Sequence, residues 1–144
     1  MKLGIKKIEY IQSALCRDFS YYSRNSSIKL SGFISNSLQE LPFTQDSASF
    51  EEKWDKESAG GFSSIKISGV IRANKEEYSD TLQQLFAGHF VYVVTTVSGV
   101  VYVIGSRESP ARLVFNNTIS ALSTSEYSFT ITCESLHGAL FVEE

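Results

Sequence analysis

The sequence predicts a mainly-β, single-domain fold, either a β-sandwich or a partly closed barrel, with one packed α-helix at about residues 74–88. Several segments alternate apolar and polar residues with a period of two, which is typical of half-buried strands. One segment has the helical period instead. The length of 144 residues suits one domain with a sizeable core, so residues 1–144 are expected to form a single unit.

The N-terminal part of the chain contains short candidate strands separated by polar segments. In residues 3–10 the apolar positions change parity partway, which indicates a strand with a bulge or two short strands. Residues 17–27 are polar and serine-rich and predict a loop, whereas residues 28–34 predict a short strand. Residues 38–54 are interrupted by Pro42, so one strand is expected on either side of a bend.

Residues 62–71 predict a strand with one buried and one solvated face. Isoleucines occupy one face and polar side chains the other, with Ile65, Ile67 and Ile71 opposite Ser64, Lys66 and Ser68. Gly60 and Gly61 precede this strand and predict a turn. Gly69 inside it indicates a bulge or a close approach of the backbone.

The clearest helical signal lies in residues 74–88. Asn74 is expected to cap the first turn, and Glu77 is placed to reach back to the cap. Apolar side chains then follow the spacing of one buried stripe, at Tyr78, Leu82, Leu85 and Phe86. Gly88 stands where a left-handed residue commonly ends a helix.

A β-hairpin that is apolar on both faces is predicted directly after the helix, in residues 90–105. If Ser98 and Gly99 form a two-residue loop, Val97 lies opposite Val100, and the remaining facing pairs are apolar or contain Thr or Gly. A ribbon with two apolar faces must be covered twice. We therefore expect it at the centre of the sheet or at a subunit interface.

The C-terminal part predicts a polar stretch, a short strand over residues 111–115, a tight connection at residues 116–118 and a Ser/Thr tract at residues 120–125. The last strand, residues 127–133, has the most regular alternation in the chain. Its expected inward side chains are Tyr127, Phe129, Ile131 and Cys133.

Charge and hydropathy argue against several classes of partner. The formal net charge of −3 comes from 13 basic and 16 acidic residues that are scattered, so no basic stripe predicts binding to specific nucleic-acid sequences. No segment has the continuous apolar run of a signal peptide or membrane span. The protein is therefore expected in the cytoplasm of the producing cell or in a virion. Cys16 and Cys133 are expected to be buried thiols, although one disulfide stays open as an alternative.

No segment predicts a catalytic residue, a metal site or a cofactor. Cys133 and His137 lie four residues apart, but Cys133 is on the inward parity of a strand, and two ligands do not make a zinc site. His89 follows the end of the helix, where an imidazole has a structural role. The acidic cluster in residues 51–57 is interleaved with lysines and predicts a solvated, charged edge strand or loop.

Three aromatic residues in polar stretches remain as candidate contact residues: Tyr21, Tyr22 and Trp54. Their rings could stack on a sugar or a base, or dock a partner chain. The alternative is partial burial against the rim of the β domain.

The order of segments in residues 38–135 is LPFTQDSASFEEKW, a glycine pair, FSSIKISGVI, a capped helix ending LQQLFAGH, VVTTVSGVVYVIG, SRESPARLVF and EYSFTITCES. This succession resembles small structural proteins of phage and prophage particles, of the tail-tube or tail-completion type. The resemblance implies a β-sandwich with one flanking helix and subunits that extend their sheets across a ring interface. It implies no catalytic residue.

The leading hypothesis is a non-enzymatic structural subunit of a phage or prophage-like particle that self-associates and contacts other virion proteins. The alternative is a carbohydrate- or peptide-binding β-sandwich module that uses the three contact aromatics. An enzyme based on Cys133 and His137 is the third hypothesis.

Overall fold

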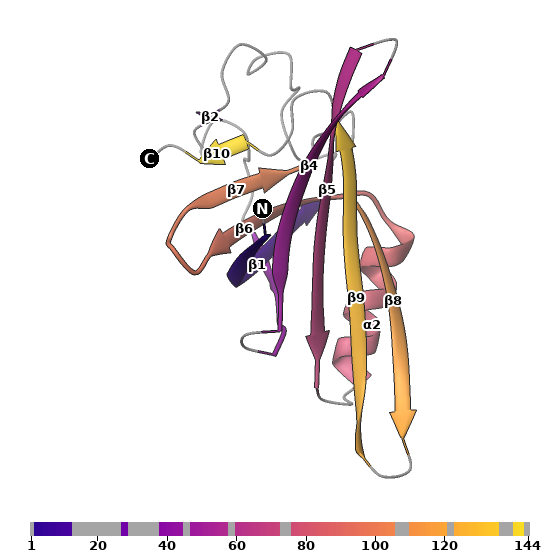
Figure 1. Ribbon diagram of the computed structural model, residues 1–144. Coiled ribbons are helices and arrows are strands. Elements are labelled where there is room, and N and C mark those ends of the chain that lie inside the picture. The colour runs from indigo at the N-terminus through magenta and orange to yellow at the C-terminus, as the bar shows by residue number, and fades with distance from the viewer. Residues whose placement is uncertain are drawn as a thin grey trace.

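The computed structural model describes residues 2–12, 27–28, 38–44, 47–57, 60–72, 76–105, 110–120, 123–135 and 140–142. Within these residues the chain forms one ten-stranded sheet and one helix (Figure 1). The strands are β1 (Lys2–Gln12), β2 (Ser27–Ile28), β3 (Gln39–Leu41), β4 (Ser49–Glu57), β5 (Gly60–Ile71), β6 (Phe90–Thr96), β7 (Val101–Ile104), β8 (Arg112–Ser120), β9 (Ser123–Ser135) and β10 (Leu140–Val142). The helix is α2 (Glu76–Ala87).

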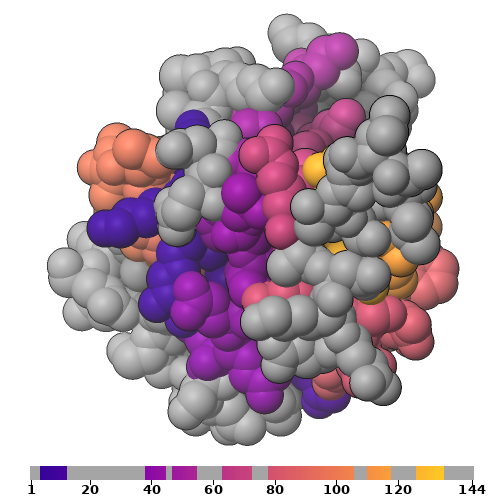
Figure 2. Space-filling view, turned by 90° about the horizontal axis from the view of Figure 1, so that it is seen from below, coloured from indigo at the N-terminus to yellow at the C-terminus, as the bar shows by residue number. Residues whose placement is uncertain are grey.

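The strand order is β2-β10-β7-β6-β1-β4-β5-β9-β8, and β3 also pairs with β1. The long strands β4, β5, β9 and β8 run alongside one another, and β6 and β7 cross their direction (Figure 1). Viewed from below, the purple atoms of residues 38–54 lie between indigo β1 and the orange-to-yellow atoms of β8 and β9 (Figure 2). The sheet therefore has two halves of different direction.

β1 joins these two halves. Its first residues pair with β4, as Lys2 opposite Glu51 shows, and the rest of the strand pairs with β6. The register shifts between Ile5 and Lys7, so the bulge predicted from the parity change is confirmed. The bulge lets Ile5 and Ile8 both point into the core.

The sheet curves so that the start of its edge strand β8 comes back next to β6, but it does not close into a complete barrel. A single bridge joins Ala111 to Phe90, and the N–H of Ala111 donates to the Phe90 carbonyl over 3.0 Å. Leu82 and Leu85 anchor α2 in the core on the inner side of β8. The predicted mainly-β fold with one packed helix is confirmed, and the continuous sheet corresponds to the partly closed barrel.

The alternations predicted for β5 and β9 are also confirmed. Their inward side chains are buried, namely Ile65, Ile67 and Ile71 on β5, and Tyr127, Phe129, Ile131 and Cys133 on β9. Gly69 is a point of close approach, since an added Cβ would lie 2.6 Å from Cζ of Phe129. Gly60 and Gly61 do not precede the strand as predicted, because they are its first two residues and pair with Glu57 and Lys56. The change of direction that they predict lies directly before them, between β4 and β5.

The β6–β7 hairpin is central, as predicted, but its register is not the predicted one. Val93 lies opposite Val103, so the loop has three residues, Val97–Gly99, and Val97 does not face Val100. Gly99 has a φ of +94°, which suits a turn followed by a left-handed residue. Both faces are buried, with Tyr92, Val94 and Ile104 on one side and Val91, Val93 and Val103 on the other.

The helix differs from its prediction at its C-terminal end. The described helix is Glu76–Ala87, and the expected cap Asn74 lies outside the described residues, so it stays a prediction. Gly88 is not left-handed, because Gly99 and Gly105 are the positive-φ glycines among the described residues. Instead, Gly88 leaves room for the ring of Phe90. Phe86, expected in the buried stripe, is 60% exposed at the last turn.

The predicted connection at residues 116–118 is wrong, because β8 continues through it. Asn116 pairs with Ser128 and Asn117 with Tyr127, so cross-strand pairing overrides the local turn preference of the two asparagines. Most of the Ser/Thr tract likewise belongs to β8 and β9. The predicted loop at residues 17–27 lies mostly outside the described residues, as do Cys16 and His137.

Candidate functional site

The long half of the sheet has two edges, and their side chains differ. On β4, no described strand pairs with residues 52–57 on the side away from β5. This segment carries five charged side chains: Glu52, Lys53, Asp55, Lys56 and Glu57. Charges, lysine above all, protect a strand edge from pairing with another chain. The predicted charged edge is found only in residues 52–57, because β4 lies between β1 and β5 and its residues Ser49–Glu51 pair with β1.

β8 forms the other edge and has almost no such protection. Of its nine residues, Arg112 alone is charged, and the strand contains no proline. Val114 is 54% exposed on its outer face. Beyond the bridge at Ala111, no described strand pairs with β8 on the side away from β9. A long, neutral edge of this kind is a template for an added strand.

The backbone groups that β8 offers at this edge follow from the bridge. The Ala111 N–H points away from β9, toward Phe90. Because N–H and C=O groups alternate sides along a strand, those of Leu113, Phe115 and Asn117 also point away from β9. The regular alternation ends at Thr118, where the β8–β9 register shifts.

Aromatic side chains lie on the inner side of the β8 edge. The rings of Phe86 and Phe115 meet edge to face, with centroids 6.3 Å apart. Phe115 in turn contacts Tyr127, with centroids 6.5 Å apart. Leu113 is buried, whereas Asn117 is exposed and Phe115 is half-buried. We call the outward groups of Phe115 and Asn117, together with Phe86, the β8 edge site. It combines backbone groups that no described strand pairs with exposed aromatic surface.

Of the three predicted contact aromatics, the structure describes Trp54. Its ring is 55% exposed, and its Nε1–H donates to Oε1 of Glu52 over 2.6 Å. It lies opposite Ser63 of β5, which pairs in turn with Ser135 at the end of β9. The β4–β5 hairpin extends beyond the neighbouring strands (Figure 1). Tyr21 and Tyr22 lie outside the described residues, so the three aromatics are not shown to form one site.

Cys133 is a buried thiol. Burial, and to a lesser extent the charge of Glu134, raise the pKa of Cys133 to about 11, so it is protonated at neutral pH. It borders a hollow of about 340 Å³ that is also lined by Pro110, Arg112, Thr132 and Glu134. A protonated thiol is a poor nucleophile. In the part of the chain that the structure describes, no three His, Cys, Asp or Glu side chains group as metal ligands.

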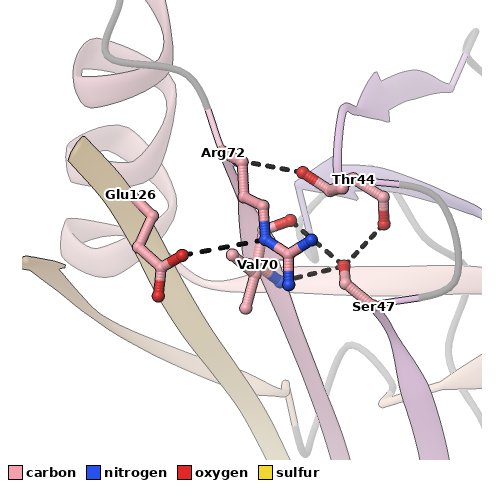
Figure 3. Close-up of polar contacts among 5 residues, drawn as sticks. All are labelled: Thr44, Ser47, Val70, Arg72 and Glu126. Carbon is pink, nitrogen blue, oxygen red and sulfur yellow. Dashed lines mark hydrogen bonds and ion pairs between the residues drawn. The ribbon is translucent and has the colours of Figure 1, made fainter. Parts of the chain in front are cut away.

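A polar cluster at the other end of the long strands is structural. Ser47 Oγ–H donates to the Thr44 carbonyl over 2.6 Å, and Ser47 Oγ accepts from the Val70 N–H over 3.2 Å (Figure 3). The Arg72 N–H donates to Thr44 Oγ1 over 2.9 Å, and the Arg72 side chain lies 3.8 Å from a Glu126 oxygen. These bonds fasten the connection between β3 and β4 to the end of β5.

Sequence reasoning recognised the charged edge of β4 but missed the β8 edge site. The sequence feature that could have indicated the β8 edge site is the absence of charged residues in β8 after Arg112, in contrast to the charged residues 51–57. No helix in the described ranges is long and apolar enough to cross a membrane. Comparison of the chain with protein-family models, curated proteins and solved structures found no match.

Proposed function

We propose that the protein is a non-enzymatic structural subunit of a phage or prophage-like particle, of tail type, that acts by self-association through its sheet edge. Its partners are further copies of itself and other virion proteins, and it needs no cofactor. It resides in the cytoplasm of the producing cell or in the virion. The observation that carries the proposal is the neutral edge of β8, with which no described strand pairs beyond Ala111 and which contrasts with the charged residues 52–57 of β4.

The physical argument rests on this difference between two edges of the same sheet. Charged side chains on β4 oppose the addition of a strand, whereas β8 presents outward backbone groups, Val114 and Phe86. A strand added to β8 would satisfy those groups and cover the apolar surface beside them. Self-association through β8 therefore explains why this edge lacks protective charges.

The test is the mass of the particle in solution, measured by light scattering and native mass spectrometry over a wide concentration range. We expect wild-type protein to form oligomers. Asn117→Pro removes an outward N–H without breaking the β8–β9 ladder, so it should abolish association, whereas the matched control Asn117→Ala should not. Strictly monomeric wild-type protein at high concentration would refute self-association.

The particle itself is tested by genomic position and by electron microscopy. We expect neighbouring genes to encode virion proteins, and purified oligomers to show regular closed or stacked assemblies. Neighbouring genes unrelated to virions, together with a monomeric protein, would exclude the proposal.

The second candidate function is a carbohydrate- or peptide-binding module, and the geometry of Trp54 favours it. Glu52 holds an exposed indole in place, and such a ring can stack on a sugar while the carboxylate accepts a hydroxyl. Trp54 is the sole tryptophan, so intrinsic fluorescence reports on this position alone. A titration with glycans and peptides that leaves the emission unchanged would exclude Trp54 as the contact residue.

A further inference from the structure

We infer that the hollow beside the start of β8 is a binding site for a free α-amino acid, in which Arg112 binds the carboxylate and Glu134 binds the ammonium group. The hollow has a volume of about 340 Å³. Ligand pockets have volumes of about 300–1,000 Å³, so this one suits a small ligand. The inference does not rest on the proposed self-association, because it uses side chains on the face of the sheet rather than the edge of β8.

The hollow forms where β8 and β9 separate. Arg112 and Thr132 are the first pair of the β8–β9 ladder, and no pairing of Pro110 with Glu134 continues it. Pro110 has no N–H to donate, and the Ala111 N–H is bonded on the other side of β8. The ladder therefore ends at Arg112, and a space opens between Pro110 and the end of β9.

The backbone groups of Glu134 face this space. The N–H and C=O of Arg112 point toward β9, since the N–H of Ala111 points away from it. Thr132 pairs with Arg112, so its own groups point toward β8, and those of Glu134, two residues further along β9, point the same way. In the part of the chain that the structure describes, no backbone hydrogen bond joins Glu134 to Pro110. The hollow therefore offers a ligand one backbone donor and one backbone acceptor.

Side chains of opposite charge line the hollow. Arg112 lies opposite Thr132, and Glu134 follows Thr132 by two residues, so the three side chains share the exposed face of the sheet. Arg112 and Glu134 are diagonal neighbours, a spacing that long side chains can bridge. Neither of them forms an ion pair with the other or with any further residue of the described ranges. A ligand between them can therefore bind both charges.

These two charges favour a zwitterion over a simple ion. A simple anion would bind the guanidinium but would be repelled by the Glu134 carboxylate, and a simple cation would meet the reverse. A free amino acid carries both charges on one small molecule. Its carboxylate can accept two N–H groups of Arg112, and its ammonium group can donate to Glu134. The Thr132 hydroxyl is a further hydrogen-bond partner, and the Pro110 ring offers an apolar wall for the side chain of the ligand.

Saturation-transfer NMR on the full chain tests the site, with L-alanine and L-valine as probes. The method observes the ligand, so it works for a monomer and for an oligomer. Because the charged side chains are exposed, we expect weak, saturable binding that weakens as the salt concentration rises. N-acetyl-L-valine lacks the ammonium group and L-valine amide lacks the carboxylate, so the dissociation constant of each should be about tenfold higher or more.

Two variants and a matched control locate the binding. Arg112→Gln and Glu134→Gln each remove one charge from an exposed side chain, so the circular dichroism spectrum should not change. Each should raise the dissociation constant of L-valine about tenfold or more. Lys66→Gln is the control, because Lys66 is a cation that lies opposite Thr132 on the β5 side, outside the hollow. It should change the dissociation constant by less than about twofold.

Each other outcome overturns the inference in a distinct way. Equal binding of L-valine and N-acetyl-L-valine would show that Glu134 binds no ammonium group and that the hollow takes any carboxylate. Equal effects of Lys66→Gln and Arg112→Gln would show general attraction to the charged face instead of a site. Absence of saturation transfer to both free amino acids would show that neither binds. None of these results bears on self-association, which Asn117→Pro tests separately.

Discussion

Substitution of Gly88 by alanine tests how the chain passes from α2 into β6. The backbone at Gly88 is not left-handed, so alanine can adopt it without conformational strain. Its Cβ would, however, lie 2.6 Å from Cε2 and 3.3 Å from Cζ of Phe90. Phe90 is 3% exposed, and its ring packs edge-on against Tyr10 at 5.7 Å, so it has little room to retreat. The substitution therefore overpacks this corner.

Two opposing effects determine the sign of the change. Overpacking of a well-packed core costs about 1–3 kcal/mol. A glycine-to-alanine substitution at a compatible backbone gains about 0.4–1 kcal/mol by restricting the unfolded chain. The difference between these ranges reaches about 2.6 kcal/mol, and because the ring of Phe90 is buried and only 2.6 Å away we expect Gly88→Ala to lower the free energy of unfolding by an amount in the upper part of this range. Without the contact to Phe90, the same substitution would stabilise the protein.

Urea unfolding followed by circular dichroism measures the effect, and a double-mutant cycle assigns it. In a Phe90→Leu background the ring is absent, so the penalty of Gly88→Ala should largely disappear. Gly88→Ala protein as stable as wild type, or an equal penalty in both backgrounds, would refute the steric explanation.

Three further substitutions test the core and its polar contacts. Gly69→Ala should lower the free energy of unfolding by about 1–3 kcal/mol, because its Cβ meets the ring of Phe129, and Phe129→Leu should relieve part of the loss; an unchanged urea midpoint would contradict this. Burial raises the pKa of Cys133 from 9.0 to about 11, so the folded protein should react slowly with thiol reagents at pH 8. Below pH 9 the thiol is protonated in both the folded and the unfolded protein, so its ionisation does not affect stability. Between pH 9 and 11 the thiol ionises in the unfolded protein but not in the folded one, which lowers the free energy of unfolding by about 2–3 kcal/mol. Cys133→Ala should lack that loss, and equal pH profiles for the two proteins would exclude the assignment. Ser47→Ala removes the hydrogen bonds to Thr44 and Val70 and should cost about 1 kcal/mol in thermal or urea unfolding; a neutral effect would show that water replaces the hydroxyl.

The sequence predicted those strands in which one face is buried and the other solvated. The isoleucines of β5 and the aromatic residues of β9 alternate strictly with polar residues. Only one orientation of each strand places all of these apolar side chains in the core. The bulge in β1 was predictable for the same reason. Ile5 and Ile8 have opposite parity, so both can face the core only if the register shifts between them.

Features that depend on competition between local and distant interactions were not predictable. Ser98 and Gly99 fit a two-residue loop as well as the three-residue loop that forms, and the choice moves the register by one residue. Asn116 and Asn117 favour turns by themselves, but pairing with β9 keeps them in a strand. Local residue propensities do not include the energy of pairing with a strand that is distant in the sequence.

The same limit applies to the β8 edge site. The charges of residues 51–57 predict a charged strand edge from the sequence itself, and residues 52–57 of β4 have no described partner on one side. That β8 is also an edge depends on the order of strands in the sheet, which is a tertiary property. The exposure of Phe86 depends on where α2 crosses β8, and helical spacing alone assigned this residue to the buried stripe.

The position of β1 has a consequence for folding during synthesis. β1 is synthesised before β6, yet Ile8 pairs with Val94 and Ile11 with Val91, which leave the ribosome much later. Until then, β1 can pair with β3 and β4, but the side of β1 that pairs with β6 lacks its native partner. Contacts between distant parts of a chain slow folding and prolong the exposure of hydrophobic, aggregation-prone surface. We therefore expect nascent chains that end before β6 to require chaperones, and the domain to gain protease resistance only after β6 has emerged.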